Sequence, residues 1–220
     1  ACGGMAGAKL GGSSAGYRLL SALGHSVTPL RPSLVQLKSG WFALPSLKGV
    51  RANCRAQIFR NGRLFSESSG ELQFTDYGLS GPVIFEISRD VCHGGGDWEC
   101  QLDLLPDIGT DALFTALAAR RDTALPVQEL LTGVLHNRLG RVLCKAAGLR
   151  ADTPIRTLSD ADLRAVCELV KCLRICLTAP LGMDAAQVTA GGVRTAEFDP
   201  QTMESRIVPG LFACGEVLDI

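Results

Sequence analysis

The sequence predicts an α+β fold: a small antiparallel β-barrel or sandwich, three helices and two glycine-rich end segments. Two changes in hydrophobic period carry this prediction. Apolar residues recur every second position from Val27 to about Leu105, and at helical spacing from about Thr110 to about Leu177. The two ends of the chain follow neither pattern and are rich in glycine. We therefore divide the chain into four stretches, at residues 1–25, 26–108, 109–180 and 181–220.

The second stretch contains the expected strands. Residues 50–58 alternate apolar and polar side chains and run into Asn61-Gly62, a pair that favours a type I′ hairpin turn. Residues 98–104 alternate in the same way. We expect further strands around Leu72 and Phe74 and over residues 83–87. Several short strands separated by turn signals are typical of a small antiparallel barrel or sandwich.

The third stretch contains the expected helices, which would pack as a small bundle. One spans about 111–121, a second begins at Pro126 and ends at Gly148, and a third follows Ser159 and extends to about Leu177. Ser159 and Asp162 have the spacing of a capping box. A shorter helix is expected over residues 15–23. His25 follows it, where a cation suits the helix dipole.

Composition excludes several classes of protein. The chain has 220 residues, 46% of them apolar and 20% charged, which is typical of a globular protein with a sizeable core. Lys plus Arg and Asp plus Glu both number 22, so we expect no nucleic-acid partner and no polybasic membrane contact. Since no apolar run approaches the ~20 residues of a membrane-spanning helix and no signal peptide is visible, we expect a cytoplasmic protein without membrane association.

Nine cysteines are scattered through the chain. Most lie in apolar stretches, so we expect buried, reduced thiols there. For Cys2 and Cys214 we favour packing over a redox role. Cys172 and Cys176 come nearest to a metal-ligand spacing, but no matching histidine accompanies them, and we expect no metal site.

The tail ends in an apolar run, residues 211–214, followed by Gly215 and Glu216. A glycine and a carboxylate at the end of a buried strand suit a parallel sheet that binds a ligand beyond its carboxyl edge. The same tripeptide also fits an ordinary strand exit. The residues alone leave both interpretations open.

Several segments of the ends and middle together resemble one family. They are Ala1-Cys2-Gly3-Gly4, residues 16–25 and 29–35, Phe74-Thr75-Asp76-Tyr77-Gly78-Leu79-Ser80-Gly81-Pro82, Thr189-Ala190-Gly191-Gly192-Val193, and residues 199–205, 209–212 and 215–220. In this order they resemble the bacterial FAD-dependent flavoproteins of the aminoacetone-oxidase-like (BaiN-type) group, over nearly the whole chain.

The resemblance implies a fold and a set of cofactor-binding residues. Residues 1–25 and 181–220 would be pieces of an FAD-binding domain of the two-dinucleotide-binding-domain type, with a β-barrel (26–108) and a helical bundle (109–180) inserted between them. Gly3 and Gly4 would close the strand that passes the cofactor. Gly191, Gly192 and Val193 would place backbone amides near the flavin, Gly215 would allow close backbone approach, and Glu216 would bond ribityl or ribose hydroxyls.

One departure from the family pattern limits the implied activity. The chain contains no Gly-x-Gly-x-x-Gly, the turn that holds the pyrophosphate of FAD. We therefore expect an excised middle section of a flavoprotein that binds FAD weakly or not at all by itself, is inactive alone, and self-associates through cut surfaces. The parent is expected to be an FAD-dependent oxidoreductase with a small-molecule substrate, reduced by NADH or NADPH or oxidising its substrate. No residue is assigned a catalytic role.

A second hypothesis stays open beside the first. Small barrels often serve as stand-alone binding modules for a peptide, an RNA or a protein partner. The neutral charge and the 5% of aromatic residues favour the flavoprotein over this alternative.

Overall fold

A computed structural model describes residues 2–92 and 94–220 of the chain, which divides into two compact units. The first, here the glycine-rich unit, comprises Ala1–Gln36, Ser88–Gly94 and Ala179–Ile220. The second, here the barrel–helix unit, comprises Leu37–Ile87 and Gly95–Thr178. Ala1, which opens one of the segments quoted above, lies outside the described residues.

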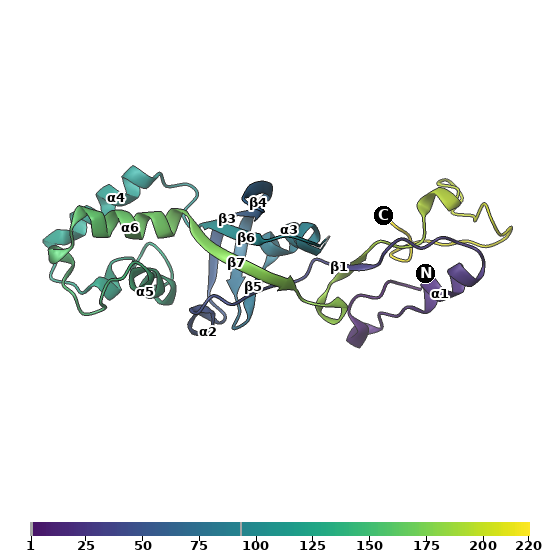
Figure 1. The fold of residues 1–220 in the computed structure, drawn as a ribbon, viewed down its shortest axis with the longest axis horizontal. Helices are drawn as coiled ribbons and strands as arrows, with labels where there is room; N and C mark the ends of the chain where they lie inside the picture. The colour runs from purple at the N-terminus through teal and green to yellow at the C-terminus, as the bar shows by residue number, and fades with distance from the viewer. Residues whose placement is uncertain (1, 93) are drawn as a thin grey trace. The chain divides into compact units, whose positions relative to one another are not determined.

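A closed antiparallel barrel of six strands forms the first part of the barrel–helix unit (Figure 1). In spatial order the strands are β2 (Leu37–Ser39), β5 (Gly78–Ser80), β4 (Arg63–Phe74), β3 (Arg51–Arg60), β6 (Trp98–Asp103) and β7 (Leu173–Pro180). The short helix α2 (Leu44–Leu47) links β2 to β3. The predicted barrel is therefore present.

The predicted alternation fills the barrel interior. Inward side chains pair across strands in layers, with Ile58 opposite Cys100 and Cys100 opposite Ile175. All three are at most 1% exposed, because every second residue of each strand faces the core. The hairpin between β3 and β4 turns at Asn61 and Gly62 with φ of 49° and 77°, which confirms the predicted type I′ turn residues.

The prediction of a strand over residues 83–87 is wrong. Pro82–Cys92 is helix α3, with Val83, Ile84, Ile87 and Val91 buried. Apolar residues at 83, 85 and 87 fit a period of two, but the buried positions follow the helical spacing i, i+4, i+8. Proline is tolerated at position 82 because N–H groups in the first turn of a helix have no partner within the helix. Its fixed φ also suits the first turn.

The third helix ends earlier than predicted. Helix α6 spans Asp160–Lys171, and the following residues form the barrel strand β7. Leu173 and Leu177 continue the helical spacing of α6, but they also alternate with Arg174 and Cys176, and pairing with β6 decides between the two patterns. The capping box is confirmed: Ser159 accepts the Asp162 N–H, and the Asp162 carboxylate accepts the Ser159 N–H.

The second predicted helix is broken. Residues from Pro126 onward form only a 3₁₀ turn, Val127–Glu129, and helix α5 begins at Asn137 and ends at Ala146. Gly133 has a φ of +82°, which interrupts a helix, and the guanidinium of Arg120 bonds the carbonyls of Glu129, Leu130 and Thr132. His136 caps α5 by accepting the Arg138 N–H.

Helix α4 spans Thr110–Ala119, close to the prediction, and 3₁₀ turns at Arg120–Asp122 and Ile155–Thr157 complete the helical part. The first helix of the chain, α1, spans Ala15–Ala22 in the glycine-rich unit, which also has 3₁₀ turns at Ala8–Leu10, Met183–Ala185 and Thr195–Glu197.

The glycine-rich unit joins the two ends of the chain. Strand β1 (Arg31–Ser33) pairs antiparallel with β8 (Val188–Ala190), and Val193 bridges to Val27 on one side and to Leu218 on the other. Tyr17 and Leu20 of α1 pack against Val193, Val217 and Leu218 in one core. Residues 27–33, which the sequence places at the start of the barrel stretch, thus pair with the tail.

The cysteines only partly follow the expectation. Cys54, Cys100, Cys144 and Cys167 are buried, but Cys2, Cys176 and Cys214 are exposed. Cys176 is exposed because it lies on the outward face of β7. None of the helices over the described residues is long and apolar enough to cross a membrane.

Candidate functional site

Two of the sequence-predicted cofactor residues, Gly4 and Glu216, meet at Thr189 in the glycine-rich unit. The Thr189 N–H donates to Glu216 Oε1 at 2.7 Å. The Thr189 hydroxyl accepts the N–H groups of Met5 and Ala6 at 2.8 and 2.9 Å. A β-carbon on Gly4 would stand 2.2 Å from Glu216 Oε1 and 2.6 Å from Thr189 Oγ1. The head therefore needs glycine at position 4 to approach the tail.

The segment Gly191-Gly192-Val193 is held mainly by hydrogen bonds to other residues of the chain. Thr28 Oγ1 accepts the Gly192 N–H at 3.0 Å, and the Val193 N–H donates to the Val217 carbonyl at 2.8 Å. Of the three amides implied to face a flavin, the Gly191 N–H is the one without a hydrogen bond to a described residue. A β-carbon at Gly191 or Gly192 would meet backbone atoms of Pro29 or Leu218, which explains both glycines by packing.

Gly3 and Gly215 differ from these glycines because their surroundings are open. Their φ angles are +69° and +80°, and no described atom lies within 4 Å of the position of an added β-carbon. At both positions the backbone is left-handed and exposed. The two stand next to Gly4 and Glu216 in the sequence, so open backbone borders the carboxylate.

The residues present fit part of an FAD molecule. Glu216 uses Oε1 to accept the Thr189 N–H and leaves Oε2 without a hydrogen bond to a described residue, so this oxygen can accept from a cofactor hydroxyl. Tyr17 is 4% exposed. Its hydroxyl group donates a hydrogen bond to the backbone carbonyl of Glu216 and so helps to position that residue. Burial raises the pKa of Tyr17, so the phenol keeps its donor proton at neutral pH.

A small pocket of about 210 Å³ borders Gly191. Thr28, Arg31, Arg89 and Asp219 contribute its polar lining. Asp219 Oδ2 accepts the Thr28 hydroxyl at 2.9 Å, which ties the end of the tail to the same threonine that bonds Gly192. Two arginines and one carboxylate line the pocket together with Gly191, and this net positive lining suits an anionic group.

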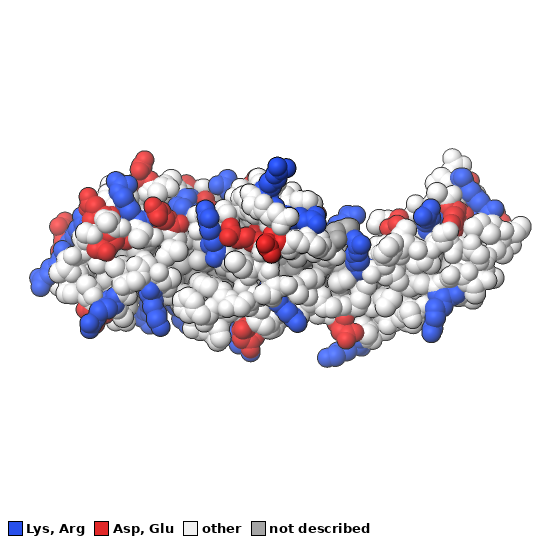
Figure 2. Space-filling model, viewed as in Figure 1, with Lys and Arg blue, Asp and Glu red and all other residues white. Residues whose placement is uncertain are grey.

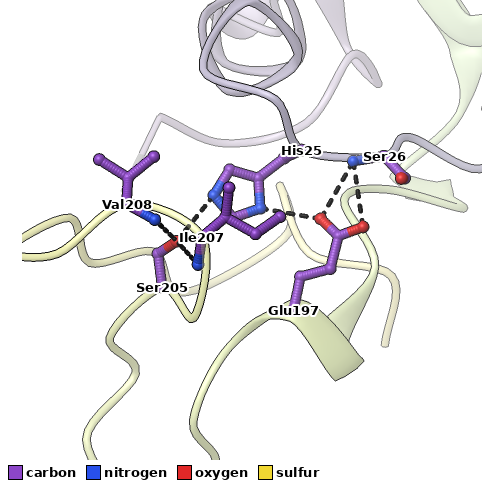
Figure 3. A network of polar contacts seen from close by, with 6 residues as sticks. All are labelled: His25, Ser26, Glu197, Ser205, Ile207 and Val208. Atoms are coloured by element: carbon purple, nitrogen blue, oxygen red, sulfur yellow. Dashed lines mark hydrogen bonds and ion pairs between the residues drawn. The ribbon is translucent and has the colours of Figure 1, made fainter.

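A second polar cluster in the same unit centres on His25 (Figure 3). Its Nδ1 lies 2.8 Å from Glu197 Oε2 and its Nε2 lies 3.0 Å from Ser205 Oγ, while the ring stacks on Phe198 at 4.6 Å. His25 is 3% exposed. His25 does follow α1, where its N–H bonds the Leu20 carbonyl, but the burial of its ring was not predicted. The chain beyond α1 turns inward and buries the ring.

Serine, histidine and carboxylate in a row match the arrangement of a hydrolase, but Ser205 is buried and its Oγ is engaged in holding a turn. Ser205 Oγ accepts the N–H groups of Ile207 and Val208 at 3.0 and 2.9 Å, as Figure 3 shows, so both of its lone pairs are engaged. Its own proton then points to His25 Nε2, which assigns the ring proton to Nδ1, facing Glu197. The cluster anchors the 205–208 turn.

Sequence reasoning missed Thr28, Thr189, Tyr17 and the Ser205 cluster. Thr189 lies within a segment quoted for its resemblance, but its partner Met5 is 184 residues away in the chain, and no local pattern signals such a bond. Among the described residues no group of three or more His, Cys, Asp and Glu side chains is placed to hold a metal ion.

Comparison with known proteins places the chain in a family. Residues 31–188 match the family described as the HI0933-like protein barrel and H2TH domain. The whole chain is 34% identical to the 3-dehydro-bile acid delta(4,6)-reductase of Clostridium scindens and covers 55% of it. It is 33% identical to the ribosomal RNA dihydrouridine synthase of Escherichia coli, again over the whole chain and 54% of the relative.

The chain thus spans about half the length of the curated relatives that it matches. The family match covers the barrel and the helical part, and the two relatives extend the similarity over both ends. The resemblance found in the sequence is confirmed, and the chain belongs to the HI0933-like family.

Proposed function

We propose that the protein containing this chain is an FAD-dependent oxidoreductase, and that the glycine-rich unit supplies part of its cofactor site. One observation carries the proposal: the head and tail meet where Glu216 bonds Thr189 against Gly4, with open left-handed backbone at Gly3 and Gly215. A flat cofactor needs close backbone approach, and its hydroxyls need a fixed acceptor. This junction offers both.

The names of the relatives support a reductive reaction. One is a delta(4,6)-reductase and the other a dihydrouridine synthase, and both names describe the addition of hydrogen to carbon–carbon double bonds. A bound flavin supplies hydride to such bonds and is recharged by NADH or NADPH. The proposal of a flavin oxidoreductase holds for either kind of substrate.

The residues of this chain bind and orient the cofactor in this proposal. Glu216 Oε2 would accept a ribityl or ribose hydroxyl, while Thr189 fixes the carboxylate and Tyr17 holds the backbone carbonyl of Glu216. The Gly191 N–H lies in a pocket that Arg31, Arg89 and Asp219 also line, and this amide and the two arginines would stabilise the negative charge of a reduced flavin ring. Thr28 holds Gly192 and Asp219 in place through hydrogen bonds of its hydroxyl group.

The 220 residues alone should hold FAD poorly, because they contain no Gly-x-Gly-x-x-Gly to bind its pyrophosphate. The alternative was a stand-alone barrel module for a peptide, an RNA or a protein partner, and the structure gives no support to peptide binding by strand addition. The barrel is closed, and a closed barrel has no edge strand to which a peptide could add.

Replacement of Glu216 in the full-length protein tests the proposed role. Glu216→Gln keeps the Oε1 acceptor for Thr189 but removes the charge, and a charge-assisted hydrogen bond contributes about 1.5–3 kcal/mol. We expect roughly ten- to hundredfold weaker FAD binding, measured by titration of the apoprotein. The control Glu168→Gln changes an exposed carboxylate of α6. Equal FAD affinity of the Glu216 variant and wild type would reject the role.

A second titration uses the 220-residue chain by itself. We expect no stoichiometric FAD binding at micromolar concentration. Tight binding would show that the pyrophosphate needs no residues beyond these.

A further inference from the structure

The neutral net charge of the chain conceals a strongly basic segment. Residues 137–156, which cover α5 and the loop after it, contain five cations and one carboxylate, Asp152. The cations are Arg138, Arg141, Lys145, Arg150 and Arg156. The zero net charge of the whole chain does not count against nucleic-acid binding by this segment. The electrostatic field of a cluster of charged side chains acts within about one Debye length, so the local charge decides.

Helix α5 arranges these cations along one face. Arg138, Arg141 and Lys145 stand at i, i+3 and i+7 and are exposed, while Leu139 and Leu143 are fully buried on the opposite side. Figure 2 shows Lys and Arg side chains along the edge of the region where Figure 1 places α5. The three cations span about 10 Å along the helix axis, the length of roughly three successive phosphates of one strand.

Other cations of the helical part are used inside the fold. Arg120 bonds three backbone carbonyls, and Lys171 bonds the carbonyls of Leu105 and Ile108 as well as Asp103. In contrast, Lys145 and Arg156 form no ion pair with a described residue. Arg141 and Arg150 pair only with partly or fully exposed carboxylates, Glu129 and Asp152, and such pairs are weak and readily exchanged for a ligand.

A hollow of about 650 Å³ lies beside the basic face. Three cations, Arg141, Lys145 and Arg150, and one carboxylate, Asp152, contribute to its lining, and Val142 and Leu149 are apolar parts of its wall. No aromatic side chain lines it, so stacking of bases is not its chemistry. Its three cations suit the repeated single charges of a phosphodiester backbone.

We propose that the exposed face of α5 and the loop to Arg156, here the α5 basic face, bind the phosphate backbone of RNA. Charge complementarity supports this partner, and one relative of the chain is by name a ribosomal RNA dihydrouridine synthase. The inference deepens the proposed function and rests on it, because it makes an RNA the partner that carries the substrate base. Contacts to phosphate position an RNA without reading its sequence.

The test measures binding of a fluorescein-labelled RNA hairpin to the 220-residue chain by anisotropy at several KCl concentrations. The variant Arg141→Gln/Lys145→Gln/Arg150→Gln removes three cations of the hollow and keeps Arg138, whose guanidinium bonds the Ser46 and Lys48 carbonyls. We expect at least tenfold weaker binding, and a slope of log K against log [KCl] smaller in magnitude by about 2 to 3.

The matched control removes three exposed cations elsewhere, in the variant Arg18→Gln/Arg63→Gln/Arg164→Gln. It has the same net charge and should bind within about twofold of wild type. Equal loss in both triple variants, or no binding by wild type at low salt, overturns the inference. Circular dichroism melting confirms that each variant is folded.

The two proposals fail separately. FAD binding by the full-length protein is measured without RNA. A normal flavin titration with no RNA binding rejects only the α5 basic face. RNA binding by a protein without flavin rejects the oxidoreductase and the role of the RNA as its substrate, but keeps the α5 basic face as an RNA-binding surface.

Discussion

The carboxylate of Glu216 lies where a β-carbon on Gly4 would stand, 2.2 Å from Oε1. These two residues are at opposite ends of the chain, and the Thr189 N–H holds the carboxylate at 2.7 Å. The contact explains why the glycine-rich ends fold together. It also places an acidic side chain beside open backbone, which is the basis of the proposed cofactor role.

Gly4→Ala should destabilise the glycine-rich unit. The added methyl group would displace Glu216 from the Thr189 N–H, and overpacking of this kind costs about 1–3 kcal/mol. Urea unfolding measures the loss. Gly182→Ala is the matched control, since no described atom lies within 4 Å of its added β-carbon and its φ is −77°; we expect a change below about 0.5 kcal/mol there. Equal stabilities for the two variants would contradict the contact.

Ser205→Ala should lower the free energy of unfolding by about 2–4 kcal/mol, because it leaves the N–H groups of Ile207 and Val208 and the His25 Nε2 without partners. Thermal or urea unfolding provides the measurement. Ser21→Ala changes an exposed serine of α1 and should be near neutral. A loss no larger than that of the control would show that the cluster is not an anchor.

Glu197 should make stability depend on acidic pH. Burial raises the pKa of Glu197, but hydrogen bonds from Ser26 and His25 outweigh this effect and leave the pKa below its ordinary value of 4.5. The stabilisation is then complete above pH 4.5 and is lost as the pH falls toward the lowered pKa. Glu197→Gln should be less stable near neutral pH and should lose less stability on acidification. Parallel pH profiles of wild type and variant would contradict this.

The cysteines should react in classes with a thiol reagent at mildly alkaline pH. Cys2, Cys176 and Cys214 are exposed and should react first. Burial raises the pKa of Cys54 to about 12 and that of Cys144 to about 11, which suppresses their thiolates. Mass spectrometry of labelled peptides distinguishes the classes. Labelling of Cys54 as fast as Cys176 in the folded chain would show that the barrel core opens.

Local patterns predicted the elements that local chemistry decides. The Asn61-Gly62 turn, the Ser159 capping box and the alternation of residues 50–58 needed no distant partner, and each is confirmed. The prediction of secondary structure failed where the same apolar residues fitted both the helical period and the strand period. Leu173 and Leu177 fit a helix and a strand equally well, and only pairing with β6 makes them part of the barrel.

The candidate site likewise combines features that were visible in the sequence with contacts that were not. Glycines and a carboxylate after an apolar run were visible in the sequence, but the run at 211–214 is not the buried strand that we expected: it contains only an isolated bridge from Phe212 to Glu204, and Phe212 is 60% exposed. The reason for Gly4 was not visible, because it depends on contacts with Thr189 and Glu216 from the other end of the chain. The burial of the His25 ring was missed for the same reason, since its partners Glu197 and Ser205 are 172 and 180 residues away.

Anaerobic reduction of the full-length protein is the decisive measurement for the proposed flavin chemistry. We expect the purified protein to carry FAD, and NADH or NADPH to bleach its absorbance. A full-length protein that contains no flavin, and that takes up none when FAD is added, would contradict it.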